Sequence, residues 1–600
     1  MALALINDPD ILQVAISHQP APVIHNPADP VLLAHGLLQD PGAVPLVIAV
    51  AGHRDPRPEY VPLLRQNFLQ QLEQLINALP HTPLLMLNGL AEGMDSEAAD
   101  VFLELIAGDR ARRGALAPHH QLVGALPKTP EDYRGDFSDP VALHRLEQLL
   151  ASCDGLLHPG NCSGLVVPSN GPGEVIEIDP AACYGQQGGF LVRHCYLLFG
   201  FFDGVETQLV GGTSQTVSIQ KGEIHPLFVS VDEVLANKET GALVLHHTPR
   251  LKAGSPVETP GAIQFWPAPN PAIASLSPDG IQLPSNLLVI PNRFDEINAQ
   301  FTKPGFESTC YNTAEGSFSK LWSLANKRAI ASKSRYELWC RVLVISGFVL
   351  VLLAQLSPVA QGLWWALLLL AFVLFPKLQQ GPKLDFIAQR CLAECLTVQH
   401  LWIALDVDDD AADLFHSRSN GDLAWIRTVL RAVSIQLLAF HSCEDRLYEN
   451  AVFKSHIWIN EQVNFLKKRI LENIRFAARW RALALILAAL AIVIATLQSL
   501  PGSNWQLAPW VVVLIAGLAS ALAYSNLIGY ADTADRYQRS LRQFERGQRA
   551  MALLERDQGE EPTRNHQRQR IAVEALGREK LDELNDWVAG QLQRVYAPGA

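Results

Sequence analysis

Two long stretches of this sequence contain no charged residue, residues 342–376 and residues 482–531. A membrane-spanning helix needs about 20 apolar residues, so each stretch is too long for one simple span. Turn-forming residues interrupt each stretch near its middle, at Pro358 and at Pro501. Lipid offers backbone polar groups no partners, which favours two helices joined by a tight turn. The sequence therefore predicts an α-helical membrane domain with four transmembrane helices in two hairpins. Buried hairpins of a soluble protein are the alternative.

The charges beside these stretches predict the orientation of the hairpins. Arg341 and Lys377 flank the first stretch, and Arg481 and Arg536 flank the second, whereas neither turn carries a charge. Positively charged residues stay on the cytoplasmic side of a membrane. We therefore expect a multi-pass protein of the inner (cytoplasmic) membrane, with the lipid bilayer as a partner and with both the N- and C-termini in the cytoplasm.

The N-terminal half of the chain has a different pattern. Residues 44–51, 83–89, 120–127 and 195–202 are apolar runs that contain few polar side chains. Such runs are typical of strands that are buried on both faces of a parallel sheet. Between the first two runs, residues 59–79 space their apolar side chains at three and four, as in an amphipathic helix. The sequence predicts an α/β Rossmann-like N-terminal domain built on a parallel sheet.

These patterns divide the chain into an ordered series of segments. We expect a leader (1–43), an α/β domain (44–255), a linker (256–320), a first transmembrane hairpin with a preceding helix (321–376), a cytoplasmic helical region (377–481), a second transmembrane hairpin (482–531) and a cytoplasmic helical tail (532–600). The segment 153–193 is rich in glycine and proline, and we expect it to be an irregular excursion from the α/β domain.

Three glycine-bearing sequences follow the predicted strands: GHRD, NGLAEGMD and DGVETQLVGGT. Ligands bind outside the carboxyl ends of parallel strands, where helix N-termini offer free N–H groups to an anion. The candidate ligand-binding residues are Gly52, His53, Arg54, Asp55, Gly89, Glu92, Gly93, Asp95, Asp203, Gly204, Gly211, Gly212 and Thr213. The predicted ligand is a nucleotide or a nucleotide-derived molecule.

Some of these residues have a specific expected role and also a structural alternative. Arg54 is placed to clamp a phosphate, or to pair with a neighbouring carboxylate. Asp203 is expected to bind ribose hydroxyls, or to cap a helix. Residues 211–213 offer successive unhindered N–H groups and a hydroxyl to a phosphate. Asp95 is expected to be the N-cap of the helix that follows, and His53 to be a structural turn residue.

Composition excludes several other kinds of protein. A net charge of −12 argues against a protein that coats nucleic acid. The nine cysteines are scattered without paired CxxC spacing, so we expect no zinc site. The acidic cluster at 406–413 suggests calcium, but Ala411 and Ser417 stand where an EF-hand loop needs glycine and glutamate. We expect this cluster to be a solvated helix end and assign no metal ligand.

The three glycine-bearing sequences, in this order and each behind an apolar strand, resemble the SLOG superfamily of Rossmann-like nucleotide-sensing domains. The membrane half looks like the SLATT class of two-helix membrane modules, a likeness that rests on its architecture. These resemblances imply a bacterial sensor and effector. Its cytoplasmic domain would bind a nucleotide-derived signal and control a transmembrane module, which as a homo-oligomer would disturb the membrane in antiphage defence.

SLOG-like enzymes that cleave a nucleotide's N-glycosidic bond carry the pattern PGGxGTxxE. In this chain GGT at residues 211–213 is followed by Ser214, Gln215 and Thr216, with no acid at the required position. We therefore assign no catalytic residue and favour recognition over catalysis. A membrane-tethered nucleotide N-glycosidase or phosphoribohydrolase-like enzyme that uses Glu92 or Asp203 is the alternative, and a passive membrane scaffold is the third possibility.

Overall fold

The computed structural model resolves the chain into two units, each described by itself below. One unit comprises Met1–Trp322 and Trp402–Tyr448, and the other comprises Ser323–Leu401 and Glu449–Ala600. The residues that the structure describes are 42–158, 182–207, 209–223, 241–252, 260–267, 282–303, 306, 317–356, 361–405, 407, 409–415, 423–441, 446–500, 507–556 and 562–596. The predicted leader lies almost wholly outside these residues.

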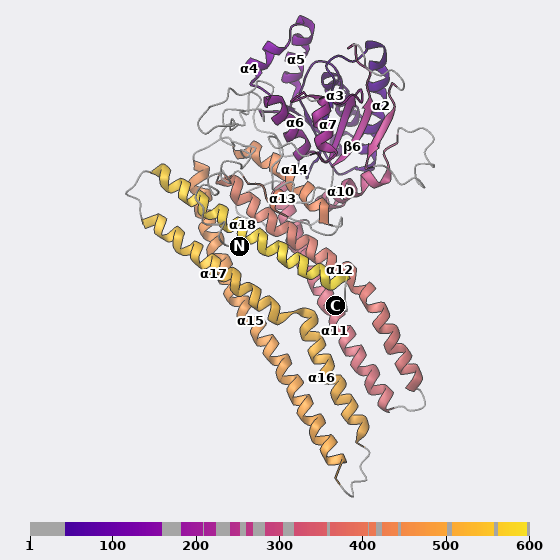
Figure 1. Ribbon diagram of the computed structural model, residues 1–600, viewed down its shortest axis with the longest axis vertical. Coiled ribbons are helices and arrows are strands. Elements are labelled where there is room, and N and C mark those ends of the chain that lie inside the picture. Colours follow the sequence, from indigo (N-terminus) through magenta and orange to yellow (C-terminus); the bar gives the residue numbers. More distant parts are fainter. Residues whose placement is uncertain are drawn as a thin grey trace, which may run out of the picture. The chain divides into compact units, whose positions relative to one another are not determined.

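A seven-stranded sheet forms the centre of the first unit (Figure 1). Its spatial order is β4 (Gly155–Leu157), β3 (Gln121–Ala125), β2 (Leu84–Asn88), β1 (Leu46–Gly52), β5 (Leu197–Phe202), β6 (Ala242–His247) and β7 (Ile263–Trp266). Every pairing is parallel except that of β7 with β6. The prediction of a largely parallel sheet with helices is confirmed. The strand order reverses at β1, which has β2 on one side and β5 on the other.

The helices of this unit pack in two groups. The first group contains α2 (Val61–Ala78), α3 (Met94–Arg113) and α5 (Pro140–Ser152), and the second contains α6 (Ala182–His194), α7 (Thr213–Gln220) and α14 (Ala424–His441). Short elements complete it: α4 (Pro130–Tyr133), α13 (Ala411–Leu414) and the 3-10 turns Pro58–Tyr60, Gly114–Leu116, Arg134–Asp136 and Ser285–Leu288. Helix α6 is a regular helix, so the prediction of an irregular excursion is wrong for residues 182–193. Residues 159–181 lie outside the described part.

Aromatic side chains fix the central strands against α2. The ring of Phe68 meets those of Phe199 and Phe201 edge to face, at centroid distances of 4.9 and 5.6 Å. The buried imidazole of His246 on β6 stacks on Phe201 at 4.8 Å. Because interiors are close-packed, these contacts hold α2 against β5 and β6 and so position the loop at the carboxyl end of β5.

Residues 256–320, where we expected a linker, contribute a strand and a helix to the first unit, besides the 3-10 turn Ser285–Leu288. One is strand β7, and the other is helix α10 (Val289–Phe301), which begins within a segment that has a strand-like apolar run. Pro291, Phe294 and Ile297 are buried at helical spacing, so packing selects the helix. The amide of Asn298 accepts from the Val44 N–H at 2.9 Å and donates to the Val44 carbonyl at 2.8 Å. These bonds join α10 to the chain that enters β1.

The segment Trp402–Tyr448 also belongs to the first unit, although it lies between two long helices of the second unit in the sequence. Asp410 caps α13 by accepting from the Ala412 N–H at 2.7 Å. Asp413 is 5% exposed and binds the guanidinium groups of Arg193 and Arg431. The prediction of a solvated helix end is therefore wrong for these two carboxylates. Asp406 and Asp408 lie outside the described residues.

Long helices make up the second unit: α11 (Ser317–Leu356), α12 (Gln361–Ala404), α15 (Arg446–Gln498), α16 (Ala508–Ile528), α17 (Tyr530–Arg556) and α18 (Pro562–Tyr596). Three described stretches are long and apolar enough to cross a membrane: Ser317–Gln355, Ser455–Gln498 and Ala508–Leu554. Large apolar side chains such as Leu485 and Ile492 are 70% and 67% exposed, as expected for surfaces that face lipid. The protein is thus a membrane protein. Side chains in part of α12 lie outside the described set, so a fourth span stays a prediction.

An aromatic cluster joins α11, α15 and α16 within this unit. It contains Tyr336, Cys340 and Tyr524, and Trp480 packs against it. The Arg341 guanidinium donates to the Tyr524 hydroxyl at 3.1 Å, and the rings of Trp480 and Tyr524 lie 4.8 Å apart. These contacts hold α11 against α15 and α16 at the end of the apolar segments that the flanking charges predict to be cytoplasmic.

Candidate functional site

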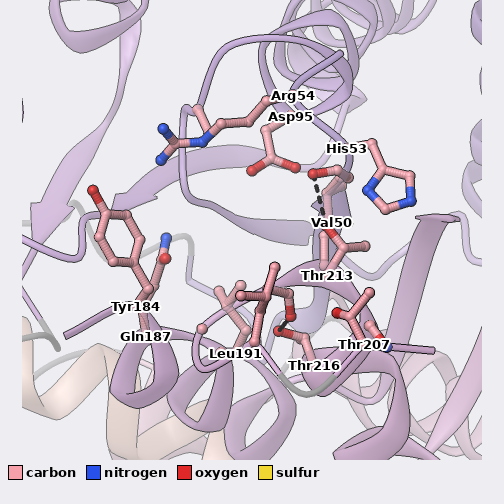
Figure 2. A pocket seen from close by; sticks show the side chains of 18 of the residues that line it. Val50, His53, Arg54, Asp95, Tyr184, Gln187, Leu191, Thr207, Thr213 and Thr216 are labelled. Atoms are coloured by element: carbon pink, nitrogen blue, oxygen red, sulfur yellow. Dashed lines mark hydrogen bonds between the residues drawn. The ribbon is translucent and has the colours of Figure 1, made fainter. Parts of the chain in front are cut away.

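A pocket of about 220 Å³ opens where the strand order reverses, beside the carboxyl ends of β1 and β5 (Figure 2). The carboxyl ends of strands at such a switch point are the usual ligand site of open α/β sheets. The pocket is lined by Val50, Ala51, Gly52, His53, Arg54, Ala91, Asp95, Tyr133, Tyr184, Gln187, Gly188, Leu191, Val205, Thr207, Leu209, Gly211, Gly212, Thr213, Ser214, Thr216 and Arg250.

His53 joins the ends of β1 and β5. Its ring Nε2 atom accepts the Asp203 backbone N–H at 3.1 Å, and the backbone N–H of His53 donates to the Phe201 carbonyl at 3.1 Å. Burial lowers the pKa of His53, although the nearby Asp203 carboxylate opposes this shift. The lowered pKa favours the neutral imidazole near neutral pH. His53 thus lines the pocket and also fixes the loop that carries Arg54, as expected for a structural turn residue.

Arg54 supplies positive charge at the mouth of the pocket. Its side chain is exposed, and its guanidinium lies 5.4 Å from the centroid of the Tyr184 ring on α6. Lys128 lies 5.3 Å from the same ring and pairs with Asp136 at 2.7 Å. The Tyr184 hydroxyl also donates to Asp136. An exposed guanidinium held against an aromatic ring is ready to bind a phosphate.

The N-terminus of α7 forms a second wall of the pocket. Gly212 is the N-cap residue, and no side chain caps the helix there. Gly211 has a φ of +78°, and its N–H donates to the Gln215 side chain at 2.6 Å. The Thr213 hydroxyl donates to the Gly52 carbonyl at 2.9 Å, which ties α7 to the end of β1. The first turn of α7 therefore directs backbone N–H groups at the pocket, where they favour an anion.

The N-terminus of α3 forms the opposite wall. Gly93 is its N-cap, so the prediction that Asp95 caps this helix is wrong. A Cβ on Gly93 would lie 2.5 Å from the carbonyl oxygens of His53 and Arg54, and its φ is +87°. A close backbone approach therefore requires this glycine. Only glycine therefore fits as the N-cap of α3 against the loop that follows β1.

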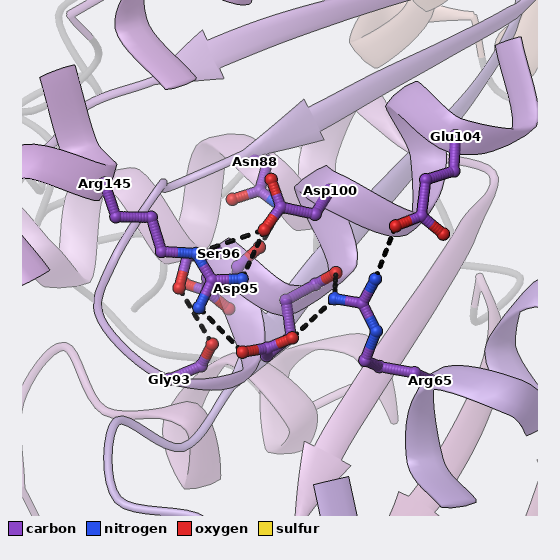
Figure 3. A network of polar contacts seen from close by, with 9 residues as sticks. Arg65, Asn88, Gly93, Asp95, Ser96, Asp100, Glu104 and Arg145 are labelled. Carbon is purple, nitrogen blue, oxygen red and sulfur yellow. Dashed lines mark hydrogen bonds and ion pairs between the residues drawn. The ribbon is translucent and has the colours of Figure 1, made fainter. Parts of the chain in front are cut away.

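A polar network holds the start of α3 in place (Figure 3). Asn88 at the end of β2 donates to the Asp95 carbonyl at 2.9 Å. Glu97 binds Arg65 of α2 at 2.5 Å and Arg145 of α5 at 2.6 Å. These bonds connect α3 to the two helices packed beside it, so the Asp95 side chain projects from a fixed backbone.

The Asp95 carboxyl group is the unusual feature of the pocket. It is 8% exposed, and its Oδ1 atom has no hydrogen-bond partner among the described residues. Burial raises the pKa of Asp95 to about 7, against the opposing influence of the Gly52 amide and the Arg54 guanidinium. Near neutral pH this carboxyl group therefore exists in both its charged and its neutral forms.

The pocket collects part of the predicted set of residues. Gly52, His53, Arg54, Asp95, Gly211, Gly212 and Thr213 line it, whereas Asp55, Gly89, Glu92, Gly93, Asp203 and Gly204 do not. Asp55 pairs with Arg250 at 2.6 Å, and the Gly89 carbonyl accepts the Tyr133 hydroxyl at 3.1 Å. The Asp203 carboxylate accepts the Val205 N–H at 3.1 Å and lies beside His53. In the pocket, the carboxylate comes from Asp95 instead.

Sequence reasoning missed the residues that α6 contributes. Tyr184, Gln187 and Leu191 line the pocket from one face of this helix, at the spacing of three and four. Gly188 lies between them, and a Cβ there would be 2.6 Å from the Thr216 hydroxyl of α7. The glycines that concealed the helix in the sequence are thus explained in part by its close packing. The spacing of 184, 187 and 191 is the signal that was available.

Residues 458–567 match the family described as SMODS and SLOG-associating 2TM effector domain 1, SLATT_1. The matched residues include most of α15 and all of α16 and α17, so this part is similar to a membrane-associated effector module with two transmembrane helices. The match includes no residue of the sheet, and the SLOG resemblance stays a prediction. Comparison with curated proteins and with solved structures found no match. Within the described residues, no cluster of His, Cys, Asp or Glu is arranged to hold a metal ion.

Proposed function

We propose that this protein is a membrane effector whose α/β unit binds a nucleotide-derived signal in the pocket beside β1 and β5, and that the bound ligand controls the membrane module. One observation carries the proposal: Arg54 and the uncapped start of α7 line the same pocket at a switch point of the sheet. Together they offer a guanidinium and backbone N–H groups to one phosphate.

The aromatic wall supports a ligand with a ring as well as a phosphate. Tyr184 lies against Arg54, and Tyr133 lines the pocket nearby. A pocket with an aromatic side, a cationic side and one carboxyl group has the mixed character of a mononucleotide site. The SLOG resemblance implies the same class of ligand.

Helix α6 supports a path from the pocket to the membrane module. Tyr184 and Gln187 line the pocket, and Arg193 at the end of the same helix binds Asp413 of α13. Arg431 of α14 binds Asp413 at 2.7 Å and donates to the Arg193 carbonyl. In the chain, α13 and α14 connect α12 to α15. A ligand that favours one position of α6 therefore biases the segment between the two hairpins.

The test uses the full chain in lipid nanodiscs and in dye-loaded vesicles. A panel of nucleotides and cyclic nucleotides is screened for thermal stabilisation, and each stabilising ligand is then assayed for dye release. Gly212→Asp places a negative charge at the start of α7 and should abolish both effects. Gly212→Ala is the matched control, because a Cβ there meets nothing closer than 3.8 Å. Stabilisation that survives Gly212→Asp would contradict this pocket, and stabilisation without dye release would contradict the effector role.

A second candidate function is favoured by the Asp95 carboxyl group. A nucleotide N-glycosidase needs a carboxylate near the sugar, and Asp95 supplies one inside the pocket, where neither Glu92 nor Asp203 lies. Incubation of the full chain with the same nucleotide panel, followed by chromatography of the free bases, tests this alternative. Base release that is lost in Asp95→Asn would establish an enzyme, whereas binding without base release supports the sensor.

A further inference from the structure

The Asp95 Oδ1 atom is a buried acceptor without a donor. Its side chain is more than nine-tenths buried; the Gly52 amide lies near the carboxyl group, but no described group makes a hydrogen bond of normal geometry to this oxygen. Native proteins satisfy almost all of their buried polar atoms, so an exception in a pocket points to a missing partner. Figure 2 shows the carboxyl group among the residues that line the pocket, near Arg54 and Thr213.

A structural ion pair does not explain this carboxyl group. Arg54 is the closest candidate, but among the described residues no ion pair within 4.0 Å joins it to Asp95. The guanidinium lies against the Tyr184 ring. Asp95 is also not the cap of α3, a role taken by Gly93. The fold thus holds the carboxyl group in place without using its Oδ1 atom.

Gly52 brings this acceptor close to the proposed phosphate seat. A Cβ on Gly52 would lie 3.1 Å from Asp95 Oδ1, whereas the Gly52 carbonyl accepts the Thr213 hydroxyl at 2.9 Å. The Asp95 carboxyl group and the start of α7 therefore both lie next to Gly52. One small ligand can reach both, with its phosphate at α7 and another group at Asp95.

Charge decides what that other group is. A second phosphate beside Asp95 would place like charges together in a buried site, which is unfavourable. An ionised carboxylate only accepts hydrogen bonds, so the matching group is a neutral donor. On a nucleotide the neutral donors are the hydroxyls of the sugar and the exocyclic amine of the base.

We propose that Asp95 is the specificity-determining acceptor of the pocket and selects a nucleotide through one neutral donor, a sugar hydroxyl or a base amine. This inference rests on the proposed nucleotide-binding function. It assigns to Asp95 the role that the sequence suggested for Asp203, whose carboxylate is engaged outside the pocket with the Val205 N–H. Loss of one hydrogen bond to a charged acceptor corresponds to an affinity ratio of about 10 to 100.

The experiment is calorimetric titration of the full chain in nanodiscs with four probes: AMP, 2′-deoxy-AMP, 3′-deoxy-AMP and IMP. We expect wild type to bind AMP at least about 10-fold more tightly than one of the analogues. A weak deoxy analogue identifies a sugar hydroxyl, and weak IMP identifies the base amine. In Asp95→Asn and Asp95→Ala this preference should fall to less than about threefold, while affinity for the disfavoured analogue stays the same.

Asp100→Asn is the control, because this residue lies on the same helix, pairs with Arg145 and does not line the pocket. It should keep the wild-type preference. Equal binding of all four probes by wild type would overturn the role of Asp95 and leave the proposed function standing, as would a preference that persists in both Asp95 variants. If wild type binds neither these probes nor any nucleotide of the stabilisation panel, the proposed function itself fails.

Discussion

Removal of the Asp413 carboxylate should weaken the packing of α14 within the first unit. Asp413 is 5% exposed and neutralises Arg193, which is 9% exposed, together with Arg431. Asp413→Ala removes the carboxylate that binds both of these largely buried guanidinium groups. Breaking a buried pair by removing one partner costs about 3 to 5 kcal/mol. Arg431 retains its bond to the Arg193 carbonyl, so we expect about 3 kcal/mol, near the lower end of this range.

Hydrogen exchange in the full chain is the suitable assay, because a chain of two units does not unfold in a single two-state step. A loss of about 3 kcal/mol corresponds to about 100-fold faster exchange of the amides in α14. Glu296→Ala is the matched control, since Glu296 forms an ion pair with Arg293 in which both side chains are about 60% exposed. Exposed pairs contribute about 0 to 1 kcal/mol, so this variant should change exchange by less than about fivefold.

Two further results would refute the reasoning about Asp413. One is a rate of amide exchange in α14 that is the same in Asp413→Ala as in Glu296→Ala. The other is a failure of the triple variant Arg193→Met, Arg431→Met, Asp413→Leu to recover protection, because replacing a complete buried ion cluster by apolar side chains is often neutral. The two arginines also hold the pKa of Asp413 well below its usual range, against the effect of burial. Its contribution is therefore complete above about pH 4 and is lost only as the pH falls below that value.

The remaining predictions concern pH and backbone geometry. Since a donor favours ionised Asp95, whose pKa is about 7, AMP affinity measured by calorimetry should rise more steeply between pH 6 and 8 in wild type than in Asp95→Asn, where only the phosphate of AMP titrates. Burial lowers the pKa of His246 to about 3, so between about pH 3 and pH 6.5 the unfolded chain binds one more proton than the folded chain. The opening free energy of the β6 amides in hydrogen exchange should fall by about 1.4 kcal/mol per pH unit as the pH is lowered through this range, and His246→Phe should reduce this slope. Gly93→Ala should lower the melting temperature of the sheet unit strongly, because its Cβ would lie 2.5 Å from two carbonyl oxygens, whereas Gly212→Ala should leave it unchanged.

The strands and the pocket loops were predictable because their signals are local. Buried strands appear as apolar runs, and β1, β2, β3 and β5 form where those runs predict them. The sequence did not predict that the carboxyl group in the pocket comes from Asp95 and not from Asp203. Asp95 and Asp203 lie in two of the three glycine-bearing sequences, and the contacts that hold the Asp203 carboxylate beside His53 and Val205 are visible only in the structure.

Contributions from distant segments were also beyond local patterns. Helix α6 forms a wall of the pocket because α7 packs against it at Gly188, and this contact joins segments that no local pattern connects. The apolar face of α14 is visible in the sequence, but the sequence does not say which surface it covers. Its partners are α6, β1 and α10, which lie far away along the chain.

The position of α14 has a practical consequence for anyone who wishes to separate the sheet unit from the membrane. Ile426, Val429 and Val433 are fully buried, and α14 packs against α6 and β1. A fragment that stops at residue 322 would leave that surface uncovered and prone to aggregate. A soluble version should carry residues 402–448, fused through a flexible linker. The unit is discontinuous in the gene, and its boundaries follow packing rather than chain order.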